Sequence, residues 1–125
     1  MMNRRFTCPC CGFRTLHDFP GSYEICKVCF WEDDPVQLLD PAYRGGANTL
    51  SLMDSQATFE RIQVSDDRFV QDVRSPKPGE ERDPEWRLAT EADLKRARVP
   101  RDLSGEEHAR LEVWYYWKRK PSEAR

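Results

Sequence analysis

Four of the five cysteines form two C-x2-C pairs, a spacing that suits a metal ion. The pairs are Cys8 with Cys11 and Cys26 with Cys29, and fourteen residues separate one pair from the other. Two residues between thiolates allow a tight turn that presents both sulfurs to one ion, and two facing turns give tetrahedral coordination. The spacing therefore predicts one Zn²⁺ ion held by these four thiolates. A rubredoxin-type iron site uses the same ligands and remains an alternative.

The fifth cysteine, Cys10, lies between two ligands of a site that four thiolates already fill. We expect it to pack as a small apolar residue; a substitute metal ligand and a reactive thiol are the alternatives. The N-terminus has two arginines but no apolar segment behind them, which indicates a cytoplasmic protein without a signal peptide. Thiols stay reduced in that compartment, so a metal site is favoured over disulfides.

Composition limits both the core and the classes of function. The chain has 125 residues, of which 38 % are hydrophobic and 34 % charged, and its formal net charge is −2. Typical domains are roughly 45–50 % apolar and about 25 % charged, so we expect one domain with a small core. No apolar run approaches the ~20 residues of a membrane span. The acidic segment 32–75 disfavours a surface that follows a phosphate backbone.

The first clear helix is expected to begin at Ser51. Ser51 and Asp54 resemble a capping box, and Leu52, Phe59 and Ile62 recur at helical spacing. Residues 31–50 are rich in Asp-Pro and Gly-Gly turn signals, so we expect short turns there rather than a helix. Residues 76–86 contain three prolines and are interpreted as a linker, or as an extended strap pinned by Trp86.

Two further helical patterns follow in the C-terminal part. Thr90 and Asp93 open a short one, which Pro100 ends. Ser104 and Glu107 form a capping box for a last helix. Its predicted apolar stripe and following proline comprise Leu111, Trp114, Tyr115 and Pro121.

Acidic and aromatic side chains are the candidate partner contacts. Glu32, Asp33 and Asp34 directly follow the second cysteine pair, and Trp117 lies near the end of the last expected helix. Aromatic anchors carry most interface energy and charges steer association, so we expect these four side chains to contact a partner. Solvation or a second cation is the alternative for the acidic triplet, and core packing is the alternative for Trp117.

The chain resembles the bacterial cysteine-rich CPCC family over roughly residues 6–75. The segments that carry the resemblance are CPCCG at 8–12, YEICKVCFWEDDP at 23–35 and GGANTLSLMDSQATF at 45–59. Lys27 departs from the proline usual in that family but leaves both ligands in place. The resemblance implies a small zinc-ribbon-like domain without an assigned reaction, and an immunity role beside a toxin. It also raises another role for the acidic triplet, in which its carboxylates accept backbone N–H bonds from nearby turns.

Together these observations predict an α+β fold in which a four-cysteine zinc ribbon with rubredoxin-like knuckles packs against two or three short helices. Residues 1–75 are expected to form the ribbon and the helix that follows it, and residues 76–125 a proline-rich strap with C-terminal helices. The sequence contains no glycine-rich phosphate loop and no G-x-S-x-G motif, so we expect no enzyme. The favoured function is a zinc-stabilised protein-binding module, and the most concrete version of this role is neutralisation of a toxin. An iron electron carrier and a nucleic-acid-binding ribbon are the alternatives.

Overall fold

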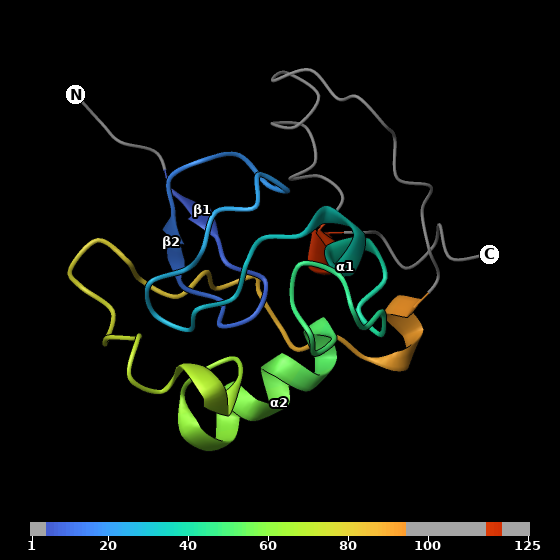
Figure 1. Ribbon diagram of the computed structural model, residues 1–125. Coiled ribbons are helices and arrows are strands. Elements are labelled where there is room, and N and C mark those ends of the chain that lie inside the picture. The colour runs from blue at the N-terminus through green and yellow to red at the C-terminus, as the bar shows by residue number, and fades with distance from the viewer. Residues whose placement is uncertain (1–4, 95–114, 119–125) are drawn as a thin grey trace.

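The computed structural model describes residues 5–94 and 115–118, and it combines a small sheet with short helices (Figure 1). Strands β1 (Phe6–Thr7) and β2 (Arg14–Leu16) pair antiparallel, with Phe6 opposite Leu16. Two α-helices follow, α1 (Pro35–Leu39) and α2 (Leu52–Ile62). Within these residues, 3₁₀ helices span Asp67–Phe69, Glu91–Leu94 and Tyr116–Lys118. This α+β arrangement, with the cysteines in its N-terminal part, is compatible with a zinc-ribbon-like fold.

Helix α1 corrects the expectation of turns alone in residues 31–50. Asp34 caps it, because its carboxylate accepts the Val36 N–H at 2.8 Å, and Pro35 occupies the first turn. Proline is favoured at that position since its missing N–H would be unpaired there anyway. The Asp-Pro dipeptide is thus a helix start here, although the same dipeptide also marks turns.

Helix α2 begins where the sequence predicts. The Ser51 hydroxyl accepts the Asp54 N–H at 3.0 Å, and Leu52 and Phe59 are buried. Ile62, expected on the same buried face, is 37 % exposed at the end of the helix. The chain then turns through Gln63, whose φ of 64° is left-handed.

Residues 76–86 form a strap that returns to the β-hairpin, shown in yellow and gold in Figure 1. The backbone of Arg14 donates to Glu81, and that of Asp83 to Gly12, at 3.0 and 2.8 Å. The indole N–H of Trp86 donates to the Pro9 carbonyl at 2.9 Å, so the tryptophan pins the strap as expected.

The predicted C-terminal elements are described only in part. Thr90 and Asp93 are hydrogen-bonded, but the segment that they open is a 3₁₀ helix. The capping box and apolar stripe expected for the last helix lie outside the described residues, except at Tyr115. Tyr116–Lys118 form a 3₁₀ helix, with Tyr115 and Tyr116 fully buried.

The core is small and contains the cysteines. Trp31, Leu16, Leu38 and Leu52 are buried around them, whereas Phe30 is half-buried and packs on Phe69 at 4.7 Å between ring centroids. Trp31 is therefore a core residue, and Phe30 lies at the edge of the core. Within the described residues, no helix is both long enough and apolar enough to cross a membrane.

Candidate metal centre

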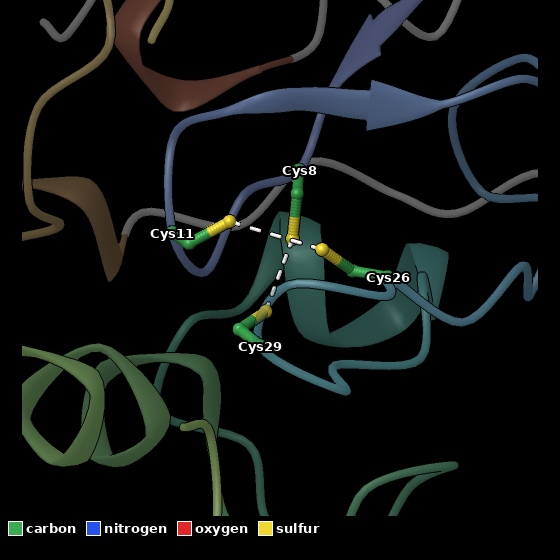
Figure 2. A group of neighbouring side chains, drawn as sticks. All are labelled: Cys8, Cys11, Cys26 and Cys29. Carbon is green, nitrogen blue, oxygen red and sulfur yellow. Dashed lines mark hydrogen bonds between the residues drawn. The ribbon is translucent and has the colours of Figure 1, made fainter. Parts of the chain in front are cut away.

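Four sulfurs converge at the centre of the N-terminal region (Figure 2). Cys8 and Cys11 come from the turn of the β1–β2 hairpin, and Cys26 and Cys29 from the loop that precedes α1. All four sulfurs lie within 4.8 Å of one another, all four residues are 0 % exposed, and all are free thiols. The structure thus brings together the four residues that the spacing singles out.

The two cysteine pairs sit on turns of the same geometry. Cys8 accepts the Gly12 N–H through its carbonyl and donates its own N–H to Phe13. In the second turn Cys26 accepts from Phe30 and donates to Trp31 in the same way. Both turns need a left-handed residue after the second cysteine, which is Gly12 at φ 82° and Phe30 at φ 70°. The hydrogen-bond pattern, and not proximity alone, therefore orients the paired sulfurs.

The sulfur positions fit a tetrahedral metal ion. Metal–sulfur bonds of about 2.3 Å place the four sulfurs of a tetrahedron about 3.8 Å apart. The Cys8–Cys29 and Cys11–Cys26 sulfur separations are 3.6 and 3.8 Å. A disulfide requires sulfurs about 2.05 Å apart, so this arrangement suits an ion and not a crosslink.

In the absence of a metal ion, burial favours the protonated form of most thiols in the cluster. Burial raises the pKa of each of the thiols of Cys8, Cys11 and Cys29 well above the usual value for a cysteine. Burial opposes ionisation of Cys26 as well, but hydrogen bonds from the other three ligands and from Thr15 outweigh it and lower its pKa well below the usual range. A divalent ion that binds here must therefore displace protons from thiols whose pKa burial has raised.

Later segments hold the backbone of the first turn. The Pro9 carbonyl accepts bonds from Gln56 on α2 and from Trp86, both at 2.9 Å. The Cys11 carbonyl accepts two bonds from the Arg82 guanidinium, at 3.0 and 2.9 Å. Sequence reasoning missed Gln56 and Arg82. Gln56 could have been found from its position between Leu52 and Phe59, which places it on the buried face of α2.

A family model for cysteine-rich CPCC proteins matches residues 6–80, which include all four ligands, both turns and α2. The chain belongs to the cysteine-rich CPCC family. A comparison with curated proteins returned no significant match. The family match extends the resemblance to Glu80 and so includes the first half of the strap.

The second cysteine of the CPCC motif, Cys10, lies outside the four-sulfur cluster. It is buried in the same core cluster as the four sulfurs. Its thiol is therefore near the site but is not one of the four that could hold an ion. Its packing agrees with the expectation of a small buried residue.

The acidic triplet of this CPCC protein is used inside the fold. Asp33 is 0 % exposed and accepts the Gly21 N–H at 2.9 Å. Asp34 caps α1 and also accepts the Ala47 N–H at 2.8 Å. Both carboxylates accept backbone N–H bonds from neighbouring turns. This corrects the expectation that Asp33 and Asp34 contact a partner directly. These two carboxylates can be buried because the turns supply hydrogen-bond donors that a sequence does not reveal.

The two remaining candidate contacts differ in exposure. Glu32 is half-buried, and its backbone pairs with the Asn48 side chain at 2.9 and 2.8 Å. Trp117 is 9 % exposed and stacks on Tyr115 with centroids 4.1 Å apart. Trp117 is thus a packing residue, which corrects its assignment as an exposed anchor. The contact of Glu32 with a partner stays a prediction.

The Gly-Gly-Ala-Asn loop, residues 45–48, is organised by one buried glutamine, Gln37. The Gln37 amide donates to the carbonyls of Tyr43, Asn48 and Leu50 at 3.0–3.1 Å. A Cβ on Gly46 would collide with the Asp34 carboxylate and with the Gln37 side chain. Glycine is therefore needed at residue 46 because of close approach, although its φ is not left-handed.

The buried Asp33 predicts a pH-dependent stability. Burial raises its pKa to about 7, with Glu24 and Asp34 adding repulsion. The folded protein thus binds a proton that the unfolded chain releases above about pH 4, so Asp33 lowers stability progressively between pH 4 and pH 7. Asp33→Asn, whose amide oxygen can still accept the Gly21 N–H, should stabilise the protein relative to wild type more at pH 8 than at pH 6.

Urea unfolding of metal-loaded wild type and Asp33→Asn at both pH values measures this difference. The metal contributes to both proteins alike at a given pH and cancels in the comparison. A stability difference that does not change between pH 6 and pH 8 would show that Asp33 is ionised throughout this range.

Proposed function

We propose that the four thiolates bind one zinc ion as a structural staple and that the protein is a non-enzymatic protein-binding module. The observation that supports this proposal is the closed ligand set, four fully buried sulfurs within 4.8 Å of one another. Catalytic zinc keeps one coordination position open for water or substrate, whereas four thiolates leave none. The ion would hold two turns together in a chain whose apolar core is small.

Zinc is proposed over iron because of the burial of the ligands. An electron carrier exchanges electrons through an exposed edge of its metal site, and here each of the four cysteines is fully covered. Structural zinc needs no such access and benefits from a dry site. The reduced state of all five cysteines is compatible with either ion.

Metal analysis of protein produced in medium with both zinc and iron tests the proposal. We expect one zinc ion per chain and a colourless protein, because zinc has a filled d shell. A red protein with one iron per chain would support the electron-carrier alternative, and a stoichiometry near zero or two would contradict the site itself.

The partner proposed is another protein, and neutralisation of a bacterial toxin is the most concrete version of this role. Residues Asp33 and Asp34 are buried and do not supply a surface for a cationic toxin. An immunity role must therefore use another face of the molecule. A neighbouring reading frame that encodes a large toxin with a divergent C-terminus would favour this role, and a housekeeping gene neighbourhood would count against it.

A further inference from the structure

A groove of about 460 Å³ lies beside the metal centre, where both cysteine turns, the end of α2 and the start of the strap meet. Its apolar lining residues are Phe13, Val28, Phe59, Ile62, Val73 and Pro76. This volume is within the roughly 300–1,000 Å³ of typical ligand sites. Because Phe13 and Val28 belong to the two cysteine turns, the metal ion indirectly sets the shape of the groove.

The charged side chains that line the groove are Arg74 and Arg82. Arg74 forms a bidentate ion pair with Glu80, at 2.8 and 2.9 Å. Arg82 instead donates to the neutral carbonyl of Cys11 and lies over the rings of Phe13 and Trp86, 4.8 and 5.0 Å from their centroids. In the described part of the chain no carboxylate pairs with Arg82, and this residue is exposed.

We infer that this groove binds a peptide segment of a partner protein that carries bulky apolar side chains next to acidic ones. The apolar floor would take the bulky side chains, and the Arg82 guanidinium would pair with a carboxylate. This inference rests on the proposed protein-binding function. It predicts an acidic partner segment, whereas contacts by the acidic triplet would have required a basic partner surface.

The chemistry of the lining favours a peptide over a nucleic acid. Six of the ten lining residues are apolar, whereas single-stranded nucleic acids bind in grooves that are positively charged along their length. One arginine without a carboxylate partner does not make such a track. Alternating apolar and acidic side chains match both the floor and the single charge.

The decisive test is selection of short peptides from a randomised library on the zinc-loaded protein, followed by fluorescence anisotropy with each selected peptide. Ile62→Glu and Ile62→Lys remove the same apolar side chain from the groove but introduce opposite charges. Leu88→Glu is the matched control, because Leu88 is 40 % exposed, close to the 37 % of Ile62, and does not line the groove.

We expect selected peptides to be rich in leucine, isoleucine or aromatic residues beside aspartate or glutamate. Ile62→Glu should weaken their binding by roughly tenfold or more, Ile62→Lys by clearly less, and Leu88→Glu by less than about twofold. Binding should also weaken at high salt, since screening reduces the contribution of Arg82.

Three outcomes would overturn the inference: selected peptides that are basic, equal binding by wild type and Ile62→Glu, and displacement of the peptides by a single-stranded oligonucleotide. Zinc content is measured on every variant before binding. A wild-type protein without zinc contradicts the proposed function, whereas a zinc-loaded protein that binds its peptides outside the groove contradicts the groove alone.

Discussion

Cys26→Ser is expected to abolish stoichiometric metal binding and to unfold the region around both cysteine turns. Hydrogen bonds from Thr15 and the other three cysteines lower the pKa of the Cys26 thiol. Structural zinc contributes roughly 10–16 kcal/mol in small zinc domains, which matches or exceeds the ~5–15 kcal/mol stability of a typical domain. Circular dichroism and metal analysis of the purified variant measure both effects.

Cys10→Ser is the matched control, because it changes the same atom in a neighbouring buried thiol. Cys10 is buried near the cluster but is not one of its four sulfurs. We therefore expect one metal ion per chain and a loss of stability of about 1 kcal/mol. Loss of the metal in Cys10→Ser, or its retention in Cys26→Ser, would mean that the wrong four thiols have been assigned.

Gly12→Ala is expected to destabilise the metal-loaded protein by about 3 kcal/mol or more. The residue has a φ of 82°, which alanine adopts only with strain. A Cβ at this position would also lie 2.6 Å from two atoms of the Trp86 indole, which is held in place by its bond to Pro9. Neither the turn nor the strap can move without losing hydrogen bonds.

Gly45→Ala separates the two causes. Gly45 has a φ of 81°, but nothing lies within 4 Å of the Cβ that alanine would add. The control should therefore lose only the cost of the backbone conformation, about 1 kcal/mol. Urea unfolding at saturating metal compares the two variants, and equal losses would show that contact with Trp86 is not the cause.

The ligand set could be predicted from sequence because its rules are local. The C-x2-C spacing and the glycine after Cys11 determine the first turn within a few residues. The start of α2 was predictable for the same reason, since the hydroxyl of Ser51 caps a helix that begins at the next residue. Local rules were ambiguous at Asp34-Pro35, which marks either a turn or a helix start.

The roles of the acidic residues could not be predicted, because their partners are distant in the chain. Asp33 accepts from Gly21 and Asp34 from Ala47, both in turns whose donors only the fold brings near. Arg82 likewise supports a carbonyl 71 residues before it. From sequence alone, a charged side chain is expected to be exposed to solvent. That a carboxylate is buried can be predicted only when the backbone N–H groups around it in the fold are known.

The ligands and the groups that later close over them are far apart in the chain. All four thiols lie within the first 29 residues, whereas the side chains that hold the first turn belong to Gln56, Arg82 and Trp86. On the ribosome, a nascent chain therefore presents the complete ligand set well before the side chains that cover it. An ion captured then would close short loops at small entropic cost and would give the remaining chain a template. With the proposed ion, metal supply during translation would therefore help to determine how much of the newly made protein folds.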